Sequence, residues 1–112
     1  AELAFRRALR KALGAAVRFE AGDLPGTPDA AVDGARLAVF FHGCFWHGCP
    51  LHYEAPRRNV AYWRAKLKAN RARDRAAVAA LRARGWRVVV VWEHDLEGDW
   101  VGRVAAEMRR GS

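Results

Sequence analysis

The chain has 112 residues, 52% of them hydrophobic, so one globular domain with a single core is expected over residues 1–112. Twenty Lys and Arg against twelve Asp and Glu give a formal net charge of +8, which favours a polyanionic partner such as nucleic acid. No apolar run approaches the roughly 20 residues that span a bilayer, and no signal peptide opens the chain, so a soluble, cytoplasmic protein is predicted. Because the sequence starts at Ala1-Glu2, already within a helical pattern, a short N-terminal segment is expected to be missing.

An amphipathic pattern opens the chain. Phe5 and Leu9 recur at helical spacing and Gly14 follows, which predicts a helix over residues 2–13 that ends at this glycine. Glu2 falls on the same face, one turn before Phe5, so a carboxylate stands on an otherwise apolar stripe.

Three short strands are predicted next. Residues 16–20 alternate in polarity, and the Gly- and Pro-rich stretch 22–29 indicates a loop. Residues 30–41 have the pattern of a hairpin that turns at Asp33-Gly34. Its second strand, 37–41, is apolar on both faces and is predicted to be central in the sheet.

The second half of the chain alternates helix and strand. A long helix is predicted over about residues 58–84, stopped by Gly85, and a terminal helix over about 98–110. Between them, residues 86–93 predict a second fully buried strand. The order α-β-β-β-α-β-α predicts an α/β fold with a mixed sheet flanked by helices.

Asn70 and Asp74 interrupt the apolar stripe of the long helix. The stripe consists of Val60, Trp63, Leu67, Asn70, Asp74, Val78 and Leu81. An ionised aspartate on a buried stripe costs several kcal/mol unless it is paired or hydrogen-bonded. Either Asp74 pairs with one of the many arginines, or the stripe passes under a polar site, and Glu2 raises the same question.

Both cysteines and three of the four histidines lie within residues 42–52. Cys44, Cys49 and His52, joined by the distant His94, form a plausible tetrahedral zinc set of two thiolates and two imidazoles. His47 is a rival to His52, and free thiols with surface histidines are the alternative to a metal site.

Aromatic residues accompany this loop. Phe45 and Trp46 lie inside it, and Trp63 stands near the start of the long helix. Exposed aromatics in a basic protein stack on bases or wedge between base-pair steps, whereas the more usual fate of aromatics is to cap the core.

A carboxylate stands where the hairpin begins. Asp29 opens its first strand and His42 ends its second. A carboxylate at such a corner can hold Mg²⁺, which takes hard oxygen ligands beside a substrate phosphate.

Four motifs, in order and over nearly the whole chain, resemble the very short patch repair endonucleases, bacterial enzymes that nick DNA beside a T:G mismatch. The motifs are LPGTPD (24–29), FFHGCFWHGCPLH (40–52), NVAYWRAKLKANRARD (59–74) and GWRVVVVWEHDL (85–96). The resemblance implies a restriction-endonuclease-like core with a zinc-stabilised loop, and a metal-activated water that attacks the phosphodiester.

The resemblance also implies roles for individual residues. Mg²⁺ would be held by Asp29 and the backbone carbonyl of Phe41, and His47 would be the general base. The remaining active-site residues would be His42, Asp74 and Glu2. The DNA-binding residues would be Phe45, Trp46, Trp63 and Asn70, and the structural Zn²⁺ ligands would be Cys44, Cys49, His52 and His94. The Cys/His loop is shorter than in the best-known members, which leaves open the choice of His47 or His52 as the zinc ligand.

A Mg²⁺-dependent nicking endonuclease is therefore expected. It would act as a monomer on double-stranded, mismatched DNA in the bacterial cytoplasm, associated with the nucleoid. The alternatives are a non-catalytic zinc-containing module that binds DNA and a restriction-type nuclease that cuts both strands. Asp29 and Asp74 favour catalysis, because a pure DNA binder has no use for carboxylates that repel phosphate.

Overall fold

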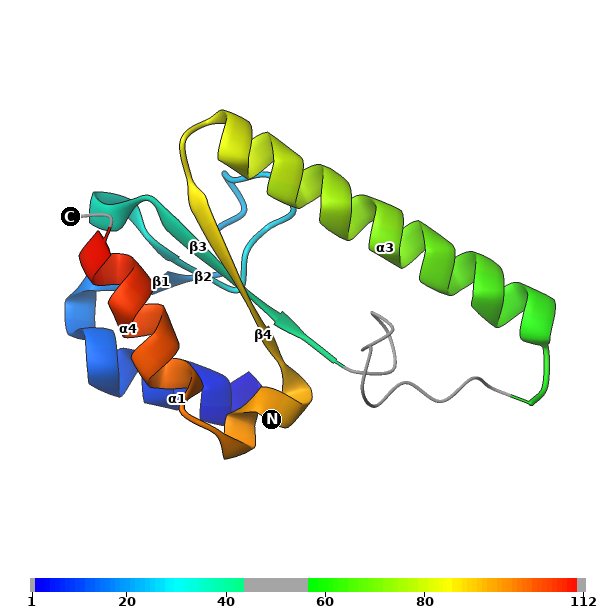
Figure 1. Cartoon of the computed structure of the whole chain (residues 1–112), viewed down its shortest axis with the longest axis horizontal. Coiled ribbons are helices and arrows are strands. Elements are labelled where there is room, and N and C mark those ends of the chain that lie inside the picture. The colour runs from blue at the N-terminus through cyan, green and yellow to red at the C-terminus, as the bar shows by residue number, and fades with distance from the viewer. Residues whose placement is uncertain (1, 44–56, 111–112) are drawn as a thin grey trace.

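A computed structural model describes residues 2–43 and 57–110 (Figure 1). A four-stranded sheet lies between α1 and α4 on one face and α3 on the other. The main elements are α1 (Glu2–Leu13), β1 (Arg18–Phe19), β2 (Ala30–Val32), β3 (Leu37–His42), α3 (Val60–Ala83), β4 (Arg87–Trp92) and α4 (Trp100–Arg110). Short 3-10 helices are η1 (Gly14–Ala16), η2 (Asp33–Ala35) and η3 (Glu93–Glu97). The predicted element order and the mixed α/β class are confirmed.

The strand order is β1-β2-β3-β4, with antiparallel pairs up to β3 and a parallel pair between β3 and β4. The central position predicted for 37–41 is confirmed, because β3 pairs on both sides. The hairpin turn runs through η2 to a left-handed Arg36 with φ 49°, two residues beyond the expected Asp33-Gly34.

The prediction of a fully buried strand over 86–93 is wrong. β4 lies at the edge of the sheet, and among its residues only Val91 is buried. Its valines still pack on both faces, which explains the continuous apolar run. A strand with one neighbour, however, leaves its outer side to the solvent.

β3 distributes its side chains alternately to the two faces. Leu37 and Val39 belong to the core under α1 and α4, and Phe41 packs against that core. Ala38 and Phe40 belong to the smaller cluster beneath α3. Because side chains alternate along a strand, His42 projects toward α3 as well. This alternation places the histidine at the carboxyl end of β3 under the middle of the long helix.

α3 ends as the sequence predicts. Gly85 adopts φ 81°, its N–H donates to the Arg82 carbonyl at 3.0 Å, and Trp86 N–H donates to the Leu81 carbonyl at 3.0 Å. These two bonds form a Schellman motif, in which glycine supplies the left-handed conformation. The turn fixes the start of β4 against the C-terminal end of α3.

Candidate active site

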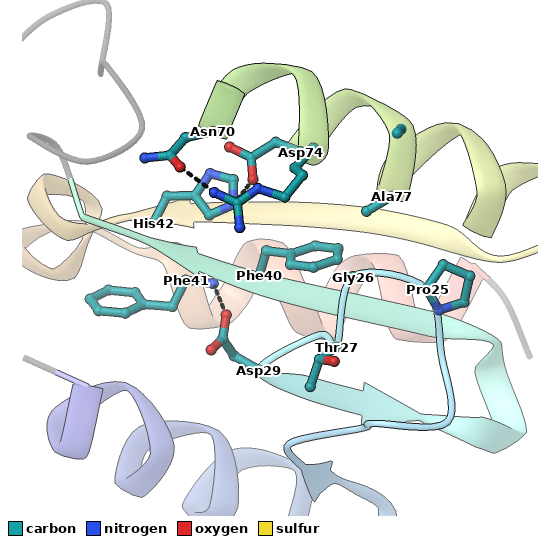
Figure 2. Close-up of a pocket in the computed structure, with 12 residues that line it drawn as sticks. Pro25, Gly26, Thr27, Asp29, Phe40, Phe41, His42, Asn70, Asp74 and Ala77 are labelled. Carbon is teal, nitrogen blue, oxygen red and sulfur yellow. Dashed lines mark hydrogen bonds and ion pairs between the residues drawn. The ribbon is translucent and has the colours of Figure 1, made fainter. Parts of the chain in front are cut away.

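A cavity of about 800 Å³ opens between α3, the end of β3 and the loop before β2 (Figure 2). Its polar and charged side chains come from all three segments, and its floor is apolar. It is lined by Pro25, Gly26, Thr27, Asp29, Phe40, Phe41, His42, Asn70, Arg73, Asp74, Ala76 and Ala77. The cavity therefore brings together Asp29, His42 and Asp74, which are distant in the sequence.

Asp29 is held at the corner where β2 begins. Its Oδ2 accepts a hydrogen bond of 2.6 Å from the Phe41 N–H, and its backbone carbonyl accepts one of 3.1 Å from the Glu20 N–H. The N–H and C=O of one residue in an extended strand point to the same side. The Phe41 carbonyl is therefore directed toward the Asp29 side of β3, beside the carboxylate.

Burial raises the pKa of the Asp29 carboxyl above its ordinary value, and the negative charge of Glu2 raises it further. The hydrogen bond from Phe41 and the positive charge of Arg6 oppose this rise. A half-buried carboxylate whose charged form is disfavoured gains from a cation placed beside it.

Glu2 lies at the start of α1, close enough to Asp29 for its charge to act on it, but it does not line the cavity. Arg6 Nη2 joins Glu2 Oε1 at 3.2 Å and Glu20 Oε1 at 2.6 Å. The glutamate that stood on an apolar stripe is therefore exposed and paired with an arginine on its own helix.

His42 and Asp74 face each other across the cavity, with 4.0 Å between His42 Nε2 and Asp74 Oδ1 (Figure 2). His42 is buried, and its ring meets that of Trp92 edge-on, with 5.1 Å between the centroids. The interrupted stripe of α3 thus passes over a polar site, which was one of the two alternatives for Asp74.

Asn70 and Trp63 lie further along the same helix. Asn70 is buried, and its Oδ1 accepts a hydrogen bond from Arg73 Nη2. Trp63 is half-buried and packs against the exposed Tyr62 with 5.1 Å between ring centroids. Asn70 lines the cavity and Trp63 does not. The DNA-binding roles expected for these two residues stay predictions.

Sequence reasoning missed Arg73, which lines the cavity beside Asp74. Its only signal was its position three residues after Asn70, on the same side of the helix. In a chain with twenty Lys and Arg, such a spacing has little specificity.

The described residues fit a magnesium ion only in part. Among residues 2–43 and 57–110, no three His, Cys, Asp or Glu side chains gather as a metal site. Mg²⁺ commonly takes one or two carboxylates and completes its octahedron with waters and substrate phosphates. The Asp29 carboxylate and the Phe41 carbonyl are hard oxygen donors on one side of β3, and they suit that requirement.

Several predicted residues lie outside the described parts of the chain: Cys44, Phe45, Trp46, His47, Cys49 and His52. His94 is described and lies in η3, directly after β4. Its Nε2 is 3.4 Å from Asp95 Oδ1. The zinc set and the aromatic wedge therefore stay predictions.

The fold and the cavity are consistent with an α/β nuclease, because a mixed sheet offers a carboxylate and a histidine–carboxylate pair at one cleft. The family model for the DNA mismatch endonuclease Vsr matches residues 1–52. The type II nicking enzyme V.XorIIP of Xanthomonas oryzae pv. oryzae is 45% identical over 105 residues, covering 92% of this chain and 75% of that protein.

Two further relatives are similar to this chain over a smaller part of its length. The DNA mismatch endonuclease Vsr of Escherichia coli K12 is 42% identical over 87 residues, covering 76% of this chain and 55% of that enzyme. The type II nicking enzyme V.NaeI of Lentzea aerocolonigenes is 46% identical, covering 69% of this chain and 46% of that enzyme. The chain belongs to the Vsr family of DNA mismatch endonucleases. None of the helices in the described residues is long and apolar enough to cross a membrane.

Proposed function

We propose that this chain is a Mg²⁺-dependent endonuclease that nicks one strand of double-stranded DNA beside a T:G mismatch. The observation that carries the proposal is the cavity that holds Asp29 on one wall and the His42–Asp74 pair on the other. The names of the relatives, which are nicking enzymes and a mismatch endonuclease, support the nick and the mismatch.

Asp29 and the Phe41 carbonyl would hold the magnesium ion. When bound there, Mg²⁺ supplies a Lewis acid that polarises the scissile phosphate and favours ionisation of a bound water. The hydrogen bond from Phe41 N–H fixes one Asp29 oxygen, so the orientation of the carboxylate is set before any metal arrives. Burial of Asp29 disfavours its bare charge, which increases the gain when a cation neutralises it.

Histidines would carry out the proton transfer that accompanies cleavage of the phosphodiester. The family resemblance assigns the general base to His47, and the imidazole pKa near 6.5 suits proton transfer at neutral pH. Asp74 Oδ1 lies 4.0 Å from His42 Nε2, so this carboxylate would orient the second histidine. His42 thus has the place of a positioning group or proton donor beside the reacting centre.

The sheet register supports the zinc assignment. His42 and Trp92 are paired neighbours at the carboxyl ends of the parallel strands β3 and β4. Cys44 follows His42 by two residues, and His94 follows Trp92 by two residues. Parallel strands end at the same edge of a sheet, so the chain leaves both strands on the side where a shared ion would lie. Cys49 and His52 complete the proposed set, and the zinc would hold Phe45 and Trp46 for insertion between base pairs.

A row of basic side chains on α3 suits the DNA backbone outside the cleavage site. The row follows one face of the helix at intervals of three or four residues. Together with Leu67, its side chains line a groove of about 240 Å³. Its members are Arg64, Lys68, Arg71 and Arg75, all exposed. Successive members are about 4.5–6 Å apart along the helix, so the row presents a line of positive charge to a polyanion.

A strand-resolved cleavage assay in Mg²⁺ tests the proposal. A duplex with one T:G mismatch and its matched control are each labelled on both strands and incubated with the protein. Asp29→Ala is the inactive variant. Asp33→Ala is the matched control, because Asp33 follows β2 as Asp29 precedes it and its carboxylate forms an exposed ion pair with Arg18.

We expect one nick, in the mismatched duplex only, that disappears in Asp29→Ala and persists in Asp33→Ala. Equal cutting of the matched duplex would keep the nuclease but remove the mismatch role. Cuts in both strands would favour a restriction-type enzyme. Binding with no Asp29-dependent cut would leave a non-catalytic DNA-binding module.

A further inference from the structure

The charge balance of the cavity is unusual for a phosphate site. Asp29 and Asp74 both line it, and each repels a phosphodiester. A cation bound to Asp29 would neutralise one of these charges. The negative charge of Asp74, on the α3 side of the cavity, would then have to be offset by a side chain of the protein. Among the cavity residues that the structure describes, Arg73 is the only Lys or Arg.

The position of Arg73 is fixed by a buried amide. Asn70, Arg73 and Asp74 lie within one turn of α3, and the side chain of Asn70 is buried while that of Arg73 is exposed. Arg73 Nη2 donates to Asn70 Oδ1. A buried acceptor on a regular helix thus holds one end of the guanidinium and limits the rotamers of a flexible side chain.

Most of the donor capacity of Arg73 remains for a ligand. A guanidinium has five N–H donors in a planar fork that matches two oxygens of a phosphate. One is used by Asn70, and no other hydrogen bond or ion pair joins Arg73 to the residues that the structure describes. This side chain combines fixed placement, positive charge and open donors at the rim of the cavity.

We propose that Arg73 binds the non-bridging oxygens of the phosphodiester at the cavity, and that Asn70 is the positioning residue that aims it. The proposal rests on the proposed function in one respect, namely that the ligand is a DNA phosphate. It also accounts for the amide on the α3 stripe, because a buried Asn70 is useful where an exposed arginine must be held still.

The first test needs neither Mg²⁺ nor cleavage. A series of T:G duplexes carries one methylphosphonate each, at successive linkages around the mismatch, and this change removes the charge of a single phosphate. Binding is measured by fluorescence anisotropy in buffer without Mg²⁺ and without chelator, so that the proposed zinc stays bound, for the wild type, Arg73→Gln and Arg82→Gln. Arg82 is the matched control, because it is an exposed arginine on the same helix that borders neither the cavity nor the groove of the basic row.

For the wild type we expect one linkage at which methylphosphonate weakens binding roughly 10-fold or more, the size of a lost charge-assisted contact. In Arg73→Gln this dependence should disappear while the other linkages behave as before. Arg82→Gln should keep the wild-type profile. An unchanged profile in Arg73→Gln would overturn the proposal, and so would a wild type that does not bind the duplex.

The second test is single-turnover cleavage at saturating DNA. Arg73→Gln should slow the cut roughly 10²–10³-fold, Arg73→Lys should recover part of the rate, and Arg82→Gln should stay within about 2-fold. The shape of the pH–rate profile should not change, because Arg73 transfers no proton. A profile displaced in pH, or an equal loss in Arg82→Gln, would contradict a phosphate-binding role.

Asn70→Ala separates positioning from direct contact. It should slow cleavage in the wild-type background and have little further effect in Arg73→Gln, because its action passes through the arginine. Additive losses would contradict this role. A wild type that binds with an Arg73-dependent phosphate profile but makes no Asp29-dependent cut would overturn only the proposed nuclease function. Cleavage with a flat methylphosphonate profile would overturn only the role of Arg73.

Discussion

The face of the sheet under α1 and α4 is filled with large apolar side chains, whereas the face under α3 changes along its length from an apolar contact to a polar cavity. On the first face, Phe5 stacks between Phe41 at 5.1 Å and Trp100 at 5.3 Å, with Leu9 and Val104 fully buried around it. The second face is built mainly on alanines, with Leu24, Phe40 and Leu81 as its large buried members.

The difference follows the path of α3. Near its C-terminal end, Leu81 and Ala77 pack on the sheet, and one turn earlier Asp74 faces His42. At its start Val60 is 45% exposed. The helix is therefore anchored at one end and covers the cavity with its middle. The polar positions of its stripe lie where the helix no longer packs on the hydrophobic core and borders the cavity instead.

Phe5→Ala should cause the largest loss of stability, because it removes the central ring of the aromatic stack on the face of the sheet under α1 and α4, called here the closed face. We expect the free energy of unfolding to fall by roughly 3–5 kcal/mol, measured by urea denaturation. Leu3→Ala is the control on the same helix: Leu3 is 59% exposed, so its truncation should cost less than about 0.5 kcal/mol. Similar losses for both variants would show that α1 does not close this face.

His42→Gln should have the opposite pattern to Phe5→Ala, because it should reduce the cleavage rate more than the stability. We expect single-turnover cleavage to slow roughly 10²–10³-fold, because removing a positioned acid–base group costs this much. The free energy of unfolding should fall by less than half of the Phe5→Ala loss. Asp74→Asn should follow in the same direction with a smaller loss, since it removes the orienting charge but keeps the imidazole. A variant that cleaves normally but unfolds easily would assign His42 to the core.

The sequence predicted the closed face better than the cavity. Periodicity identifies α1 and β3 because burial on a regular element repeats at a fixed interval, and Gly14 and Gly85 mark helix ends because few other residues adopt their φ values. An edge strand and a central strand can share the same apolar run, so residues 86–93 were wrongly predicted to be fully buried.

The cavity depends on contacts between segments that are distant in the chain. Asp74 could be recognised as misplaced on an apolar stripe, but whether its partner was an arginine or a histidine depends on which strand α3 crosses. Glu2 produced the same sequence signal and is an exposed ion-pair residue. Arg73 produced no signal, because its importance comes from the burial of Asn70 three residues away.

Gly26→Ala tests how the loop before β2 is attached to α3. Gly26 has φ 74°, and a Cβ there would collide with the Ala77 Cβ. We expect a loss of roughly 1–3 kcal/mol in urea denaturation, from left-handed strain and displacement of the helix. Gly34→Ala, which meets open space, is the control. Combining Gly26→Ala with Ala77→Gly should restore part of the loss, and strict additivity would mean that the loop and the helix are not in contact.

Asp29→Asn should raise thermal stability at neutral pH by a few degrees. The folded pKa of Asp29 is raised by burial, so its stabilising contribution exists in acid, where it is protonated, and is lost as the pH rises through that pKa. The neutral amide avoids this loss. Melting temperatures of the two proteins should converge as the pH falls toward the ordinary aspartate value of about 3.9. Mg²⁺ should raise the melting temperature of the wild type only, and an equal rise in Asp29→Asn would exclude Asp29 as a metal ligand.

Amide hydrogen exchange should reveal the smallest difference, within α3 itself. Amides of residues 64–70 should exchange faster than those of residues 77–83, because only the C-terminal half packs on the sheet through Leu81. Adding metal-free T:G duplex should slow exchange in the first segment and leave the second unchanged, since the basic row and the cavity residues belong to the first half and the middle of the helix. Uniform protection along α3 without DNA would contradict the distinction between a C-terminal half that is anchored on the sheet and an N-terminal half that is stabilised only when DNA binds.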